Sequence, residues 1–189
     1  MEKKNYTDSE LWMYMKNGDM ESLSKIYNKY FFDLFHYGLK ISGDENLTRD
    51  CIHDLFFQLW SRKNVTNQVF KVKPYLLQCF RRRIIKQLRQ NKDSMISACQ
   101  ELFYEQESSH ESHLIEDESY KESVNKILFA LQNLTRRQQE AVHLKYYMEL
   151  EYNEICEIMN LQYQSVRNLI SEGIKKMREI LKETSSSVA

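Results

Sequence analysis

Residues 151–182 read EYNEICEIMNLQYQSVRNLISEGIKKMREILK, a pattern of two helices separated by a tight turn. A helix-turn-helix needs a small residue where the second helix crosses the first, and Cys156 supplies it. Asn160 follows four residues later and tolerates a positive φ better than most non-glycine residues. The helical repeat predicts that the inner side of the second helix is formed by Val166, Ile170, Gly173, Met177 and Leu181.

The outer side of the predicted second helix carries polar side chains that both donate and accept hydrogen bonds. Such side chains contact base edges in the major groove, and cationic ones reach phosphates. We predict duplex DNA contacts from Gln162, Gln164, Ser165, Arg167, Asn168, Ser171 and Lys175, with Lys176 as a further phosphate contact. The alternative is a helical hairpin that only packs within the protein. Spacing, turn and polar outer face agree, which favours DNA reading.

The composition favours an all-α protein, because 189 residues include only 4 Gly and 1 Pro. No signal peptide pattern and no run of about 18 apolar residues occurs, so we expect a cytoplasmic protein with no membrane insertion. The cysteines have no CxxC spacing, which predicts buried thiols in a reducing compartment, not disulfides or a zinc site. They are Cys51, Cys79, Cys99 and Cys156.

Charge is segregated along the chain, although 27 basic residues balance 27 acidic ones overall. Residues 1–92 hold 17 Lys/Arg and 10 Asp/Glu, residues 93–120 hold 0 and 8, and residues 121–189 hold 10 and 9. This asymmetry predicts two small helical domains, 1–92 and 121–189, joined by a flexible acidic linker at 93–120. Within the linker we expect at most a short helical turn near 101–105.

The first block has the pattern of four helices. Thr7 and Glu10 have capping-box spacing, Asp19 is suited to cap the second helix, and Gly43 ends it. Residues 61–70 lack a clean period and are expected to form a loop before a helix at 75–89. The inner residues of the second and third helices are predicted to be Leu23, Ile26, Tyr27, Tyr30, Phe31, Leu34, Tyr37 and Ile41, and then Ile52, Leu55, Phe56 and Leu59.

The second block begins near Lys121 with an apolar helical repeat that continues to Leu134. Thr135 and Gln138 have capping-box spacing for a further helix that is expected to end near Met148. The helix-turn-helix follows directly.

A strongly basic segment occupies residues 71–92, with eight Lys/Arg and no Asp/Glu. Phe70, Tyr75 and Phe80 are interleaved with these cations, and Pro74 suits the first turn of a helix. Cations that hold phosphates beside rings that stack on unpaired bases are typical of single-strand binding. The alternative is a solvated charged face with aromatic residues in the core. The absence of a compensating acid in the segment favours nucleic acid.

Asp50, His53 and Asp54 lie on one helical face at positions i, i+3 and i+4. A metal-dependent nuclease uses such groups, but no further ligands present themselves, so a solvated or partner-binding face is favoured. His110 and His113 are also spaced for one metal, yet chance is the default explanation for them. No Ser/His/Asp motif and no Gly-rich phosphate loop occurs, so we expect neither an enzyme nor a cofactor or metal.

Two stretches resemble bacterial RNA polymerase sigma factors. Residues 18–30 and 50–60 (DCIHDLFFQLW) are similar to their core-binding region, and residues 134–140, 150–159 and 165–168 are similar to their promoter-reading domain. The order and the number of domains are those of the small extracytoplasmic-function group. The resemblance covers about 150 residues.

The resemblance implies a role for each surface. Docking on the clamp helices of the polymerase largest subunit is implied for Asp50, His53, Asp54, Phe57 and Trp60, with a second polymerase contact at the flap region. Binding of the melted −10 strand is implied for Asn64, Phe70, Lys71, Lys73, Tyr75, Arg81, Arg82 and Lys86. The final helix reads the −35 duplex, the acidic linker runs toward the active site and RNA exit path, and an anti-sigma factor is the implied antagonist.

Some positions depart from the family pattern. The family usually has Asn and Asp near Arg82 and Lys86, where this chain is more basic. Leu169 and Glu172 stand where basic residues are common, and Asn160 replaces a turn glycine. Three other functions stay open on the residues alone: a stand-alone helix-turn-helix regulator, a metal-dependent nucleic-acid enzyme and an interaction adaptor.

Overall fold

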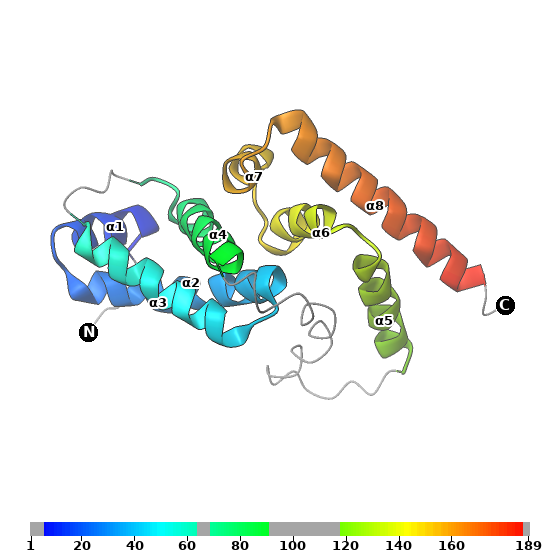
Figure 1. The fold of residues 1–189 in the computed structure, drawn as a ribbon, viewed down its shortest axis with the longest axis horizontal. Helices are drawn as coiled ribbons and strands as arrows, with labels where there is room; N and C mark the ends of the chain where they lie inside the picture. The colour runs from blue at the N-terminus through cyan, green and yellow to red at the C-terminus, as the bar shows by residue number, and fades with distance from the viewer. Residues whose placement is uncertain (1–5, 64–68, 91–117, 187–189) are drawn as a thin grey trace. The chain divides into compact units, whose positions relative to one another are not determined.

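The computed structural model describes residues 6–63, 69–90 and 118–186, and every regular element in these ranges is a helix (Figure 1). The predicted all-α class is therefore confirmed. The chain divides into two compact units, residues 1–104 and 105–189, which are described separately below. The predicted linker falls largely on residues 91–117, outside the described residues.

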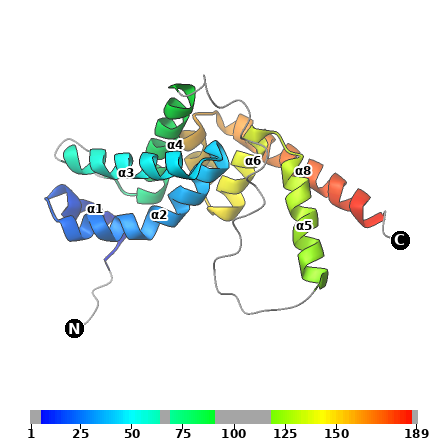
Figure 2. The ribbon, with the colours of Figure 1, turned by 60° about the horizontal axis from the view of Figure 1, so that its bottom comes forward.

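Four helices form the first unit: α1 (Asp8–Lys16), α2 (Met20–Ser42), α3 (Glu45–Ser61) and α4 (Val72–Gln90). The long α2 packs against each of the other three, and both views show α3 running beside it (Figures 1 and 2). The inward positions predicted for α3 are all buried. The core includes Trp12, Ile26, Leu34, Tyr37, Ile52, Leu76 and Phe80.

Local signals fix where these helices begin and end. The capping box of Thr7 and Glu10 is present, as predicted. The carboxylate of Asp19 accepts from the backbone N–H groups of Glu21 and Ser22 at 3.3 and 3.1 Å, and the hydrogen bond from the Ser22 hydroxyl lowers the pKa of Asp19. Gly43 ends α2 with a φ of 67°, a conformation that suits glycine.

Helices α3 and α4 approach α2 closely at Gly38, which is buried. A Cβ atom placed on Gly38 would lie 2.4 Å from Cγ2 of Thr48 and 2.7 Å from Cζ of Phe80. The hydroxyl groups of Ser42 and Thr48 lie 3.0 Å apart beside this crossing. Glycine at this position therefore sets how tightly the first unit packs.

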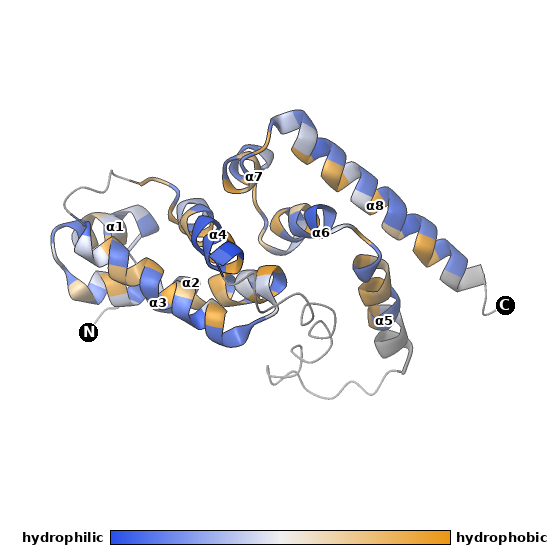
Figure 3. Cartoon of the chain, viewed as in Figure 1, coloured by the Kyte–Doolittle hydropathy of each residue, from blue (hydrophilic) through white to orange (hydrophobic). Residues whose placement is uncertain are grey.

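The second unit contains α5 (Glu118–Gln132), α6 (Arg136–Val142), the π-helical segment η1 (His143–Tyr147), α7 (Tyr152–Met159) and α8 (Tyr163–Ser186). Helix α8 packs against α5, α6 and α7. Its hydrophobic residues recur at intervals along a mainly hydrophilic helix (Figure 3). The core includes Ala130, Leu134, Ala141, Leu144, Ile155, Ile158, Val166 and Ile170.

The helix that was expected to continue to Met148 changes its hydrogen bonding before it ends. The capping box of Thr135 and Gln138 starts it as predicted, but from His143 it becomes a π-helix. Glu149 then has a φ of 58°, and the amine of Lys145 donates to the carbonyl of Leu150 at 3.1 Å. A π-helical turn holds one residue more than an α-helical turn, and the sequence carries no local signal for it.

None of the helices in the described ranges is long and apolar enough to cross a membrane.

Candidate functional site

The helix-turn-helix forms as the sequence predicts, with α7, a turn at Asn160 and α8. Asn160 has φ 53° and ψ 54°, and the N–H of Leu161 donates to the carbonyl of Cys156 at 3.0 Å. Val166 and Ile170 are buried on the inner side of α8, as is Gly173. The turn and the first half of α8 are thus held rigidly against the core of the unit.

All seven residues predicted to contact duplex DNA are exposed. The amide of Gln164 donates to the amide oxygen of Asn168 at 2.9 Å, which orients both side chains on the outer side of α8. The further phosphate contact predicted for Lys176 stays a prediction. Residue 176 lies on the side of α8 opposite to Arg167, where its amine donates to the carbonyl of Asn133 at 2.5 Å.

The N-terminus of α7 is occupied by carboxylates of its own chain. The backbone N–H of Glu151 donates to the side chain of Glu154 at 2.8 Å. Free N–H groups at a helix N-terminus commonly bind phosphate. At α7 an internal carboxylate takes that place.

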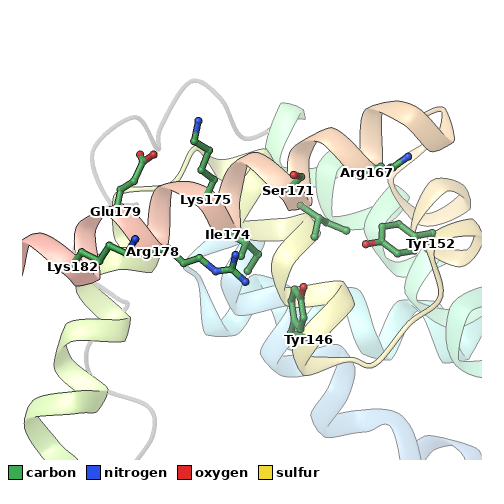
Figure 4. Close-up of a pocket in the computed structure, with 10 residues that line it drawn as sticks. Tyr146, Tyr152, Arg167, Ser171, Ile174, Lys175, Arg178, Glu179 and Lys182 are labelled. Atoms are coloured by element: carbon green, nitrogen blue, oxygen red, sulfur yellow. The ribbon is translucent and has the colours of Figure 1, made fainter.

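A groove that sequence reasoning missed runs along α8, with a volume of about 590 Å³ (Figure 4). We call it the α8 groove. Tyr146 from η1 and Tyr152 from α7 line it together with α8 side chains that include Arg167, Lys175 and Arg178. The helical repeat places residues 167, 171 and 178 on one side of α8, but the approach of η1 depends on the π-helix.

The basic helix α4 is less uniformly exposed than its composition suggests. Phe70 is 79% exposed, but Phe80 is fully buried, so the expectation of an exposed ring there is wrong. Tyr75 is half-buried with its ring 5.3 Å from that of Trp12. Aromatic and basic residues alternate in α4 because the aromatic ones lie on its inward side and the basic ones mainly on its outward side.

Two cations of α4 pair with acids from other helices, which corrects the inference of an uncompensated segment. Lys73 lies 3.0 Å from the carboxylate of Asp33, and Arg83 lies 2.9 Å from that of Asp54. Four other residues predicted to bind the strand lie on α4 or just before it. Arg81 is half-buried, whereas Lys71, Arg82 and Lys86 are exposed. Asn64 lies outside the described residues.

The outer side of α3 exposes the residues predicted to dock on a partner. Asp50, His53 and Asp54 are exposed, and Phe57 is 71% exposed although it is a large apolar side chain. Trp60 is half-buried, with the amine of Lys63 4.0 Å from its ring centroid. An exposed ring one helical turn beyond carboxylates fits a protein interface.

Across the described ranges, no three His, Cys, Asp or Glu side chains are grouped to hold a metal ion. His110 and His113 fall outside these ranges. Cys51 is buried, Cys79 and Cys156 are half-buried, and all three are free thiols. Burial raises the pKa of Cys51 to about 11 and raises that of Cys79 as well. Protonated thiols are poor nucleophiles and poor metal ligands.

Comparison with known proteins gives two family matches on the two units. Residues 26–94 match the family described as Sigma-70 region 2, and residues 125–177 match Sigma-70, region 4. The ECF RNA polymerase sigma factor SigM of Bacillus subtilis (strain 168) is 21% identical over 160 residues, covering 84% of this chain and 94% of SigM.

Two solved structures share the fold. CnrH, solved with the cytosolic domain of CnrY, gives a TM-score of 0.63 at 12% identity and covers 93% of this chain and 97% of CnrH. The sigma factor RpoE, from a co-crystal with the anti-sigma factor NepR from Bartonella quintana, gives 0.61 at 16% identity and covers 86% of this chain and 98% of RpoE. Both sigma-70 regions occur here in one chain and in the family's order, and together they span about two thirds of it. The chain belongs to the extracytoplasmic-function group of bacterial RNA polymerase sigma factors, which are transcription initiation factors and not themselves enzymes.

Proposed function

We propose that this sigma factor binds core RNA polymerase through the outer side of α3 and directs it to a two-part promoter. In this proposal α8 reads the −35 duplex, while Phe70 and the outer side of α4 hold the melted −10 strand. The proposal rests on one observation. The three surfaces belong to different helices, and each exposes the kinds of side chain that its proposed role requires.

The α3 surface supports polymerase docking. Asp50 and His53 are exposed beside Phe57, so a basic partner surface can pair with the carboxylate while the ring is buried. Exposed aromatic side chains of this kind commonly supply much of the binding energy of an interface. We assign the clamp helices of the largest subunit to this surface, and the flap region to the second unit.

The segment just before α4 supports strand capture. Phe70 is the most exposed large hydrophobic side chain in the described residues, and Lys71 follows it directly. A base that leaves the duplex loses its stacking, and stacking on an aromatic ring returns about 1–3 kcal/mol. Capture of one base by Phe70 would thus stabilise the open promoter.

An anti-sigma factor is proposed as a further partner, because the solved RpoE relative is in complex with one. We also place the protein in the cytoplasm, where core RNA polymerase works.

The decisive experiment is run-off transcription with purified core polymerase on genomic fragments, followed by mapping of the start sites. Phe57→Ala should weaken binding to core, Phe70→Ala should slow promoter opening with core binding intact, and Arg167→Ala should change recognition at −35. Arg137→Ala removes an exposed charge from α6 and serves as the control. A chain that footprints duplex DNA alone and does not bind core would instead be a stand-alone regulator, and the proposal would be rejected.

A further inference from the structure

The α8 groove carries more positive charge than the predicted base-reading residues alone provide. Its lining includes four cations, Arg167, Lys175, Arg178 and Lys182, and one acid, Glu179. Within the described part of the chain, Arg167, Lys175 and Arg178 take part in no hydrogen bond or ion pair. Cations gathered on one surface without internal partners indicate an anionic ligand.

Arg178 lies on the same side of α8 as the −35 residues. Positions 167, 171 and 178 are separated by four and seven residues, which the helical repeat places on one side. Figure 4 shows Arg178 and Tyr146 on a common side of α8, with the tyrosine supplied by η1. Tyr146 is 60% exposed.

The position of Arg178 along α8 indicates which part of the DNA it meets. Arg178 follows Arg167 by eleven residues, which corresponds to about 16 Å along the helix axis. A recognition helix contacts base edges with its N-terminal residues, so a side chain about 16 Å farther along the axis lies beyond those bases. An arginine at this distance meets the sugar-phosphate backbone that borders the groove.

We infer that Arg178 and Tyr146 bind a backbone phosphate of the promoter duplex outside the base pairs that Arg167 reads. The inference rests on the proposed −35 role of α8 and extends its footprint. The guanidinium supplies the charge and the phenol hydroxyl donates a hydrogen bond to the same phosphate group. Glu172 weakens the charge of the first half of α8, and this contact offsets that loss farther along the helix.

An acidic polypeptide fits the groove less well than DNA does. Ile170, an apolar residue of the lining, is only 3% exposed, so a peptide side chain would find apolar contact mainly on the tyrosine rings. The groove is also continuous with Arg167 and Ser171, which already belong to the proposed duplex surface.

The test measures how holoenzyme binding to its mapped promoter duplex depends on salt. Each phosphate that a protein cation neutralises contributes about −0.9 to the slope of log K against log salt. Arg178→Ala should weaken binding about fivefold and make the slope less steep by about one phosphate. Tyr146→Phe should weaken binding about twofold with no change of slope, because only a neutral donor is lost. Arg137→Ala, which removes one charge outside the groove, should match the wild type.

A second measurement locates the contact on the DNA. Single methylphosphonate substitutions remove the charge of one phosphate at a time. One substitution beyond the −35 base pairs should weaken wild-type holoenzyme and have no further effect on Arg178→Ala.

The outcomes separate the two proposals. A wild-type holoenzyme that shows no promoter-specific binding rejects the proposed function itself. Promoter-specific binding with an Arg178→Ala slope equal to that of the wild type rejects only the phosphate contact. Loss of poly-L-glutamate binding in Arg178→Ala with an unchanged DNA slope also overturns it, in favour of an acidic polypeptide.

Discussion

The Nη1 atom of Arg83 lies 2.9 Å from the Oδ2 atom of Asp54, and this ion pair joins the basic helix α4 to the outer side of α3. The Arg83 side chain is 16% exposed, whereas that of Asp54 is 57% exposed. The Nε atom of Arg83 is buried without a hydrogen-bond partner among the described groups. Arg83 therefore depends on a carboxylate that is itself accessible to a partner.

Asp54→Asn should destabilise the first unit and also weaken binding to core polymerase. The loss in stability should be about 1 kcal/mol, above the value of a fully exposed pair because Arg83 is mostly buried. Urea unfolding measures the first effect and co-purification with core the second. Asp50→Asn is the matched control, since Asp50 is exposed on the same side of α3. It should reduce core binding with unchanged stability, and equal destabilisation of the two variants would contradict the role given to the pair.

Gly38→Ala should destabilise the protein by about 2 kcal/mol, because overpacking outweighs the gain of about 1 kcal/mol in helix propensity. Its methyl group would collide with Thr48 and Phe80. Adding Thr48→Ser removes Cγ2 and retains the hydroxyl. The double variant should therefore recover part of the lost stability, as measured by thermal unfolding. Gly173→Ala is the comparison: its nearest contact is 3.1 Å, so its change should be within about 1 kcal/mol of zero.

Asn160→Ala should destabilise the second unit by about 1 kcal/mol, because alanine is disfavoured at a φ of 53°. Asn160→Gly should be neutral or slightly stabilising, since glycine adopts this conformation freely. Thermal unfolding of the two variants compares them directly. Equal loss in both variants would show that the Asn160 side chain matters more than its backbone angle.

Alkaline pH should remove a contribution of Cys51 to stability. The folded protein holds the pKa of this thiol at about 11, against 9.0 for the unperturbed group. A raised folded pKa means that the contribution is present below pH 9 and is lost as the pH rises toward 11. The free energy of unfolding, measured across this pH interval, should fall less steeply for Cys51→Ala than for the wild type.

The same thiol should react slowly with N-ethylmaleimide at neutral pH, because it is buried and protonated. Peptide mapping should show modification of Cys51 only after urea is added. Rapid labelling in the folded protein would contradict the burial of this residue.

Short-range signals predicted most of the fold. Thr7, Thr135 and Asn160 specify helix ends through residues three or four positions away, and their conformations agree with the prediction. The apolar repeat placed Leu55 and Val166 inside for the same reason.

What the sequence did not reveal depends on contacts between distant segments. Composition made α4 look uncompensated, because the acids that pair with Lys73 and Arg83 lie on α2 and α3. Phe80 was grouped with exposed rings because only the crossing with α2 at Gly38 shows that it is buried. The α8 groove needs the π-helical turn that brings Tyr146 beside α8, and no local pattern encodes that turn.

The carboxylates of Glu151 and Glu154 at the start of α7 also bear on how the protein searches the chromosome. A helix-turn-helix protein whose leading helix attracts any phosphate is retained by bulk DNA, which offers about 10⁶–10⁹ competing sites. Here one N–H group at that helix end, that of Glu151, already donates to the carboxylate of Glu154. We therefore expect α7 to add little to the affinity for random sequence, which leaves more of the protein free to bind core polymerase.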